Sequence, residues 1–293
     1  MSRHERILCP VDFSEFSKCA LAFAGSIARR FGSSLFVQHV VEAHHNIEAG
    51  FDMAKAHADG GEYLRAKGQQ SLAKFLQGGS VGDLQPAHVV SEGTATEAIL
   101  EFAVSERVDL IVMGTHSRRG LDRFMLGSVT ERVVQKATCP VLVVHGRAAE
   151  VAQAGRLPTA RGGKILLCTD LSDRSRRAVD YGWPLAADYG ADITLLHVLD
   201  TALQASPMRD SVLRAMDRLE SLAPPKGYEL APSKVAIRIG KPYEEIIALA
   251  MEGRFDLVML SACGEGVRDT AVFGSTTNRV IQLGPCPVLV VPS

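Results

Sequence analysis

The stretch GTHSRRGLDRFMLGS, residues 114–128, contains the residue types that proteins use to hold a phosphate. Gly114 closes an apolar strand-like run, and a glycine at a strand end lets a ligand approach the backbone. Gly127 precedes a helix-like run whose first amides, from Ser128 onward, lack intrahelical partners and lie at the positive end of the helix dipole. Three arginines between the two glycines add positive charge. This stretch is therefore a candidate phosphate-binding loop.

A purely structural explanation of the same stretch is also open. Ser128 and Glu131 have the spacing of a capping box, in which the serine only caps its own helix. Gly114 would then only allow a turn. The stretch recurs, however, as SACGEGVRDTAVFGS at 261–275, with the glycine–serine pair at the same distance from the strand end. The recurrence favours a ligand-binding role.

The whole chain is a duplication. Residues 7–32 and 165–190 align at an offset of 158, and the later parts of the two copies align at an offset of 147. The first copy therefore carries 11 more residues between its second and third strands. A segment rich in Gly, Ala and Arg joins the copies and suits an exposed linker. The predicted bounds are 1–147 for domain 1, 148–162 for the linker and 163–293 for domain 2.

Each copy alternates apolar strand-like runs with amphipathic helix-like runs. In the first helix of copy 1, apolar residues recur at helical spacing. They are Ala20, Phe23, Ala24, Ile27, Ala28 and Phe31. A later helix is expected to begin with the Thr94-x-x-Glu97 capping box. This alternation predicts an α/β fold with a doubly wound parallel sheet in each copy. Ligands of such sheets bind beyond the carboxyl ends of the strands, where Asp12 and Gly114 would meet if their strands are neighbours.

Composition excludes several classes of protein. The 293 residues are 46% apolar with a net charge of −1, which predicts a folded core and argues against nucleic-acid or membrane partners. No apolar run reaches the length of a membrane span, and the N-terminus does not resemble a signal peptide. Six scattered cysteines without a CxxC pair indicate free or buried thiols in a reducing cytoplasm.

In combination, several motifs resemble the universal stress protein family in its tandem, UspA-like form. They are PVDFSE, HVV, DLIVMGTHSRRGLDRFMLGSVTERVV and CPVLVV, and the resemblance covers both copies. It implies two Rossmann-like domains, similar to adenine nucleotide alpha hydrolases, each with a five-stranded parallel sheet of order 3-2-1-4-5. That order would make the strands ending near Asp12 and Gly114 neighbours.

The resemblance also implies a nucleotide crevice in each copy, holding ATP, AMP or ADP with Mg²⁺ as an optional companion. The matching positions in copy 1 are Pro10, Asp12, Val40, Gly114, Thr115, His116, Ser117, Arg118, Arg119, Gly120, Gly127, Ser128, Val129 and Thr130. Those in copy 2 are Cys168, Asp170, Val198, Ser261, Gly264, Gly274, Ser275, Thr276 and Thr277.

Both copies depart from the G-x2-G-x9-G-[ST] pattern of nucleotide-binding members. Copy 1 has Ser117 at the second glycine, and copy 2 has Ser261 at the first. A serine impairs binding if its φ is positive or if the nucleotide packs against its α-carbon. Copy 2 also carries Glu265 and Asp269, which repel phosphate. Copy 1 is therefore the favoured site.

Other polar residues have two explanations each. Asp12 and Asp170 either bind Mg²⁺ or ribose hydroxyls, or they cap the following turn. His39 and His197, at equivalent strand ends, are expected to be hydrogen-bonded structural residues, because no nucleophile is evidently partnered with them. The segment 39–64 gathers metal-competent side chains without tight ligand spacing, so we expect a solvated, mobile segment, with a zinc-like site as the alternative. These side chains are His44, His45, Asp52, His57 and Asp59.

The sequence thus predicts a cytoplasmic stress-response protein that binds an adenine nucleotide as a sensing and regulatory module. No dedicated catalytic residues are expected, because neither a P-loop nor a kinase motif set is present. The alternatives are an interaction scaffold whose crevices have lost nucleotide, and a weak ATPase with slow hydrolysis in copy 1. The leading hypothesis includes an unidentified regulatory protein partner. The resemblance further implies pairing of the two copies through their VLVV strands, and it leaves a further homodimer open.

Overall fold

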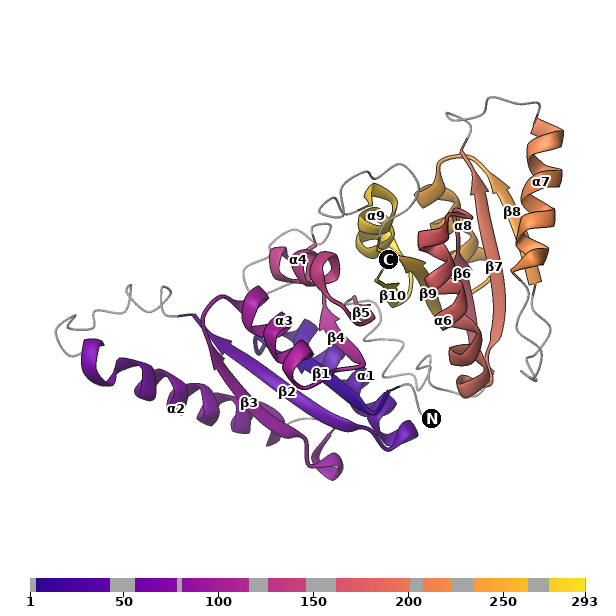
Figure 1. The fold of residues 1–293 in the computed structure, drawn as a ribbon. Coiled ribbons are helices and arrows are strands. Elements are labelled where there is room, and N and C mark those ends of the chain that lie inside the picture. Colours follow the sequence, from indigo (N-terminus) through magenta and orange to yellow (C-terminus); the bar gives the residue numbers. More distant parts are fainter. Residues whose placement is uncertain are drawn as a thin grey trace. The chain divides into compact units, whose positions relative to one another are not determined.

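The computed structural model describes residues 4–42, 56–77, 81–115, 126–145, 162–200, 208–222, 234–262 and 274–292. These residues form two compact units, which we call unit 1 (strands β1–β5) and unit 2 (strands β6–β10). In each unit, helices alternate with the strands of a parallel sheet (Figure 1). Within the described ranges, no helix combines the length and hydropathy needed to cross a bilayer.

Unit 1 has the strand order β3-β2-β1-β4-β5, and all four neighbouring pairs are parallel. This order, 3-2-1-4-5, is the predicted one. The strands are β1 (Arg6–Pro10), β2 (Ser34–Val41), β3 (Ala87–Glu92), β4 (Leu110–Gly114) and β5 (Val141–Val144). The helices are α1 (Glu15–Phe31), α2 (Ala56–Gln77), the short 3-10 helix η3 (Gly82–Leu84), α3 (Ala95–Ser105) and α4 (Ser128–Lys136).

Unit 2 repeats this arrangement, with its strands in the order β8-β7-β6-β9-β10 and every neighbouring pair parallel. Its strands are β6 (Lys164–Cys168), β7 (Asp192–Leu199), β8 (Lys234–Ile239), β9 (Leu257–Ser261) and β10 (Val288–Val291). Its helices are α6 (Asp173–Tyr189), α7 (Met208–Ser221), α8 (Pro242–Glu252) and α9 (Ser275–Leu283). The fold predicted from the duplication is therefore confirmed in both copies.

The first helix of each unit shows why these residues fold as they do. The predicted apolar stripe of α1 is buried against the sheet, with Phe23 and Ala24 at 0% exposure, except for Phe31 at the last position of the helix, which is half-buried. Ser14 caps the helix start by accepting a hydrogen bond from the Ser17 amide, and Gly32 ends it at φ 68°, a left-handed conformation that glycine adopts without strain. The same start and end recur on α6, so the repeat conserves the capping chemistry as well as the core.

A carboxylate fixes the two central strands together at their amino ends. Oδ2 of Asp109 accepts hydrogen bonds from the amides of Glu5 at 3.0 Å and Arg6 at 2.9 Å. The equivalent Asp256 accepts from the Lys164 amide at 2.8 Å. Because β1 pairs with β4 in parallel, their carboxyl ends lie at one edge of the sheet. The assumption that Asp12 and Gly114 follow neighbouring strands is confirmed.

Most of the thiols in the described part of the chain are buried. The five cysteines within the described ranges are all free, and four of them are buried. Burial raises the pKa of the Cys139 thiol to about 12 and that of the Cys286 thiol to about 12. A thiol with such a pKa stays protonated at neutral pH and is a poor nucleophile or metal ligand. The prediction of structural thiols is confirmed for these positions.

Gln38 is a polar side chain in the core of unit 1, at 0% exposure. Its Nε2 donates to Ser91 Oγ at 2.9 Å and to the Ala98 carbonyl at 3.1 Å. Its Oε1 is buried and has no hydrogen-bond partner among the described atoms. The equivalent residue of unit 2 is Leu196, which is also fully buried.

We expect Gln38→Leu to leave the free energy of unfolding of unit 1 unchanged or to raise it by about 1 kcal/mol, because it removes an unsatisfied buried acceptor. Urea denaturation followed by circular dichroism measures this. Gln38→Ala is the matched control and should lower stability by about 2 kcal/mol, because it opens a cavity. A Gln38→Leu variant as unstable as the alanine variant would show that the amide network stabilises the fold.

Candidate functional site

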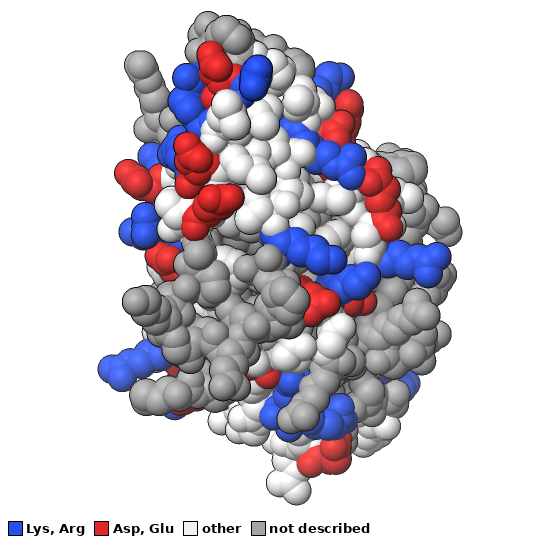
Figure 2. All heavy atoms as spheres, turned by 90° about the vertical axis from the view of Figure 1, so that its right-hand side faces the viewer, with Lys and Arg blue, Asp and Glu red and all other residues white. Residues whose placement is uncertain are grey.

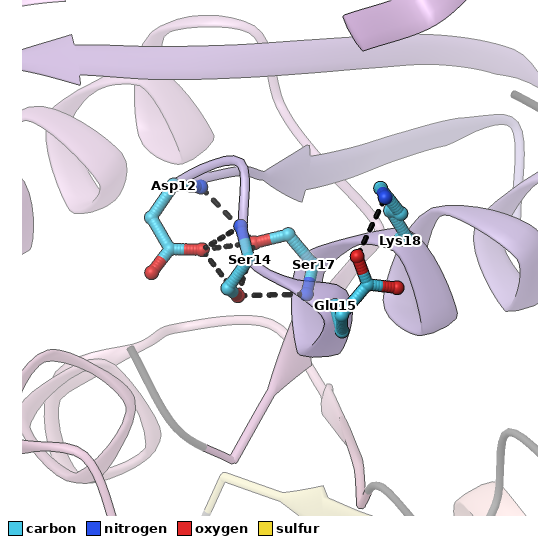
Figure 3. A network of polar contacts seen from close by, with 5 residues as sticks. All are labelled: Asp12, Ser14, Glu15, Ser17 and Lys18. Atoms are coloured by element: carbon cyan, nitrogen blue, oxygen red, sulfur yellow. Dashed lines mark hydrogen bonds and ion pairs between the residues drawn. The ribbon is translucent and has the colours of Figure 1, made fainter. Parts of the chain in front are cut away.

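The turn after β1 is organised by one carboxylate oxygen (Figure 3). Oδ1 of Asp12 accepts hydrogen bonds from the Ser14 amide at 3.1 Å, from Ser14 Oγ at 2.6 Å, and from Ser17 Oγ. The Asp12 amide in turn donates to Ser17 Oγ at 3.0 Å. Phe13, between the aspartate and the cap, has φ 66°, which is rare for a bulky side chain. Asp12 therefore performs the turn-capping role, whatever else its carboxylate contacts.

The equivalent turn of unit 2 has a different hydrogen-bond network. Asp170 Oδ1 accepts from the Ser172 amide at 3.0 Å and from Ser172 Oγ at 2.6 Å. Ser175 Oγ instead lies 2.8 Å from Thr169 Oγ1 and donates to the Ser172 carbonyl at 3.0 Å. Thr169 stands where unit 1 has Val11. A second hydroxyl thus replaces the third hydrogen bond to the carboxylate.

The histidines at the ends of β2 and β7 are structural, as predicted. His39 Nδ1 lies 2.9 Å from the Val11 carbonyl, and His197 Nδ1 lies 2.9 Å from the Thr169 carbonyl. A carbonyl oxygen can only accept, so Nδ1 carries the proton in both. The His39 ring also lies against the Phe13 ring, with centroids 4.2 Å apart. These contacts hold the turn after β1 against the next strand.

The reason for glycine at position 114 differs from the one we predicted. A Cβ at Gly114 would lie 2.8 Å from Phe16 Cβ and 3.0 Å from the Phe16 backbone carbon and oxygen. The space that we expected a ligand to use is therefore filled by the first turn of α1. In unit 2 the same position is Ser261, which is 8% exposed. A side chain is accommodated there, so this serine alone does not distort the strand end.

The last helix of each unit begins at the end of the fourth strand. The Gly127 amide donates to the Thr115 carbonyl at 2.7 Å, and Thr130 Oγ1 donates to the Gly114 carbonyl at 2.8 Å. In unit 2, Thr277 Oγ1 likewise donates to the Ser261 carbonyl at 3.1 Å. Two hydrogen bonds thus hold the amino end of α4 at the carboxyl edge of the sheet.

The alternative explanation, in which Ser128 caps its own helix, is wrong. Gly127 is the N-cap of α4, with φ −62° and ψ 137°, and Ser128 is the first helical residue. Glycine has no side chain that could cap the helix. The amides of residues 128–130 therefore have no acceptor within the helix, as at any helix start. Gly274 is the N-cap of α9 in the same way. This local geometry is compatible with an anion at the helix start.

The other predicted capping box is half right. Thr94 is the N-cap of α3, but its side chain makes no capping hydrogen bond to the described residues. The Ala95 amide instead donates to Glu42 Oε1 at 3.2 Å. Glu42 follows β2, so a carboxylate from another strand end supplies the cap. Periodicity gave no signal for this contact.

Several predicted site residues lie outside the described residues. In the described part of the predicted site, the ends of β1, β2 and β4, which carry Pro10, Val40 and Gly114, lie at one edge of the sheet together with the start of α4. The undescribed positions in the two loops are His116, Ser117, Arg118, Arg119, Gly120, Gly264, Glu265 and Asp269. The side chains of the histidine-rich segment at 43–60 are also outside the described part of the structure. Among the described residues, no group of three or more metal-competent side chains occurs.

Two domains of parallel α/β fold, each with an acidic turn after its first strand and a Gly-Ser helix start after its fourth, define a class of duplicated Rossmann-like proteins. The sequence profile of the universal stress protein family matches residues 3–145 and 163–292. The chain belongs to the universal stress protein family, with two copies of its domain.

Individual relatives agree with this assignment. A universal stress protein of Methanocaldococcus jannaschii is 35% identical over 145 residues, which cover 48% of this chain and 82% of that protein. One from Thermus aquaticus is 36% identical over 142 residues, covering 47% of this chain and 97% of the relative. The crystal structure of a universal stress protein from Archaeoglobus fulgidus matches 99% of this chain and 98% of its own, with a TM-score of 0.70 and 23% identity. The last comparison supports the two-unit fold.

Proposed function

We propose that unit 1 binds an adenine nucleotide, ATP or a related AMP or ADP, at the carboxyl edge of its sheet. The observation that carries this proposal is the start of α4, where a glycine N-cap held to the end of β4 presents helix amides to the crevice. The family adds support, since a universal stress protein has been crystallised in complex with cAMP. Pro10, Asp12 and Val40 would lie on the ribose and adenine side, and residues 128–130 on the phosphate side.

The chain's own residues would supply binding and orientation. The Asx-type turn at Asp12 fixes the floor of the crevice, because Ser14 and Ser17 are both tied to the same oxygen. With three donors on Oδ1, that oxygen is poorly suited to ligate Mg²⁺ as well. We therefore assign no metal-dependent step to it, and at most slow hydrolysis to the crevice.

In the cell, the proposed role is a cytoplasmic stress-response module whose nucleotide occupancy biases binding of a regulatory protein partner. The domain bounds proposed for it are 1–147 and 163–293. Unit 2 would be the weaker site or would serve as a scaffold. Its helix start resembles that of unit 1, but its turn after β6 leaves Ser175 bonded to Thr169 rather than to the aspartate.

Two measurements test nucleotide binding directly. Mass spectrometry of small molecules released from the purified, denatured full chain should detect an adenine nucleotide. Calorimetric titration of nucleotide-free protein with ATP should give saturable binding. Absence of both signals would exclude the proposal and favour the scaffold alternative.

We expect Gly127→Val to weaken ATP binding about tenfold or more, because a branched side chain at the N-cap would occupy the position of the phosphates. The observed φ −62° and ψ 137° suit valine, so the backbone itself should tolerate the change. Gly274→Val, at the N-cap of α9, is the matched control and should leave the affinity unchanged. The opposite pattern would place the nucleotide in unit 2, and two unaffected variants would place it away from the helix starts.

A further inference from the structure

The outer strand of unit 2 has an apolar edge that its counterpart in unit 1 lacks. Among the described strands of unit 2, β8 is last in the sheet and pairs only with β7. Val235 on β8 is 37% exposed and Ile239 is 45% exposed. On α7, the helix that packs against β8, Leu213 is 55% exposed and Met216 is 41% exposed. Figure 2 views the molecule from the right-hand side of Figure 1, where β8 and α7 are drawn, and shows an area of uncharged atoms flanked by charged side chains.

The backbone of β8 presents hydrogen-bonding groups along this edge. The Gly240 amide donates to the Leu199 carbonyl on β7. In a parallel pair, alternate residues point both backbone groups at the neighbouring strand, so the even-numbered residues of β8 face β7. The N–H and C=O groups of Val235, Ile237 and Ile239 therefore point away from the sheet. An edge of this kind is a template for another strand.

Unit 1 protects the equivalent edge with charge. Its outer strand β3 has Glu92 where β8 has Ile239, and His88 where β8 has Val235. Glu92 forms an ion pair with Arg65 of α2 at 3.3 Å. Pairing another strand there would bury charged groups, which disfavours it. The two units therefore differ in the property that controls edge-to-edge association.

We propose that β8 pairs with β8 of a second copy of this chain, antiparallel about a twofold axis at Ile237. In this register Ile237 faces its own copy, and Val235 faces Ile239 of the other copy. These are the three outward-pointing residues, so each would form a hydrogen-bonded pair. The apolar side chains left exposed on each chain would then cover one another.

The charges on the other face select this register. Arg238 forms an ion pair with Glu252 of α8 at 2.5 Å, which places the even-numbered side chains on the α8 side. With the axis at Ile237, Arg238 faces Ala236 of the second copy. Moving the axis by one residue would set Arg238 opposite Lys234 or opposite its own copy, and like charges directly opposite are destabilising. The proposed register covers Val235 and Ile239 and sets no two like charges directly opposite each other.

The first test measures how the molecular mass of the full chain in solution depends on protein concentration, by analytical ultracentrifugation. We expect a reversible dimer in the wild type, and a dimer dissociation constant raised about tenfold or more in Ile239→Glu, which copies Glu92 of unit 1. Val104→Glu, at a 61% exposed site on α3, is the matched control and should leave the constant unchanged. A wild type that stays monomeric, or a dimer unaffected by Ile239→Glu, overturns the proposal.

The second test measures the register of the two strands. It does not use Ile239→Glu, so it remains valid if that variant fails to fold. Ile237→Cys should form an interchain disulfide under Cu(II)-phenanthroline oxidation, because facing α-carbons in a hydrogen-bonded pair lie about 5.5 Å apart. Val235→Cys should not, because its own copy would lie about 13 Å away. The wild type, which has its own thiols, sets the background. Cross-linking of both variants alike, or of neither, would contradict the twofold axis at Ile237.

Discussion

Replacing Gly114 with alanine is expected to lower the free energy of unfolding of unit 1 by about 3 kcal/mol. The new Cβ would lie 2.8 Å from Phe16 Cβ and 3.0 Å from two backbone atoms of Phe16. A flexible side-chain tip could move away, but these atoms belong to the first turn of α1. The whole helix would have to shift away from β4, loosening the packing of Phe23 and Ala24 in the core.

Gly274→Ala is the matched control for this prediction. Its Cβ would meet the Ala262 carbonyl oxygen at 3.4 Å, an ordinary contact, and the φ of −59° suits alanine. We expect a change within about 0.5 kcal/mol. The single tryptophan, Trp183, lies in unit 2, so its fluorescence does not report on unit 1. Hydrogen exchange of peptides from α1 and β4 should be used, and unchanged protection in Gly114→Ala would show that α1 does not depend on this glycine.

The case of Gly114 shows where sequence reasoning stops. Internal repetition and apolar periodicity predicted the two α/β units, the buried face of α1 and, with the family resemblance, the strand order. Those properties depend on the pattern of many residues at once. The purpose of one glycine depends on which atom comes nearest in space, here Phe16, and no spacing along the chain specifies that atom.

The start of α4 shows the same limit of prediction from sequence, here among residues that are close together in the chain. The S-x-x-E spacing at Ser128 is compatible with a capping box, yet the helix begins one residue earlier than that motif requires: Gly127 is the extended N-cap, and Ser128 is already the first helical residue. Cap identity depends on φ and ψ, which a motif only suggests. The correction matters for function, because a glycine N-cap has no side chain of its own to occupy the helix amides at the place where the proposed phosphate would bind.

The two copies also differ at the residue before the aspartate. The difference is visible when the copies are aligned, but it lies outside the motifs that were compared. Val11 and Thr169 are both 6% exposed and occupy equivalent positions. The extra hydroxyl of Thr169 accepts the Leu171 amide at 3.0 Å and pairs with Ser175. In unit 1 the equivalent serine depends on Asp12 instead. In both units the aspartate is bonded to the N-cap serine, but this one buried substitution decides whether it is also bonded to the serine three residues later.

This difference predicts unequal costs for removing the two aspartates. Asp12→Ala should lower the free energy of unfolding of unit 1 by about 3 kcal/mol, because Ser14 and Ser17 lose their shared acceptor and both are buried. Asp170→Ala should cost unit 2 about 1 kcal/mol less, because Ser175 keeps Thr169. The left-handed backbone before the cap is common to both turns, so its strain does not bias the comparison.

A second substitution isolates the cause. Adding Val11→Thr to Asp12→Ala gives Ser17 the partner that Ser175 has in unit 2, and should restore about 1 kcal/mol. Hydrogen exchange across β1 and the first turn of α1 measures the recovery, with β6 and α6 in the same sample as the internal reference. Equal losses in the two aspartate variants, or no recovery with threonine, would mean that the hydroxyl pair does not replace the carboxylate. Recovery of stability without recovery of ATP binding would instead separate the structural role of Asp12 from a direct role in the crevice.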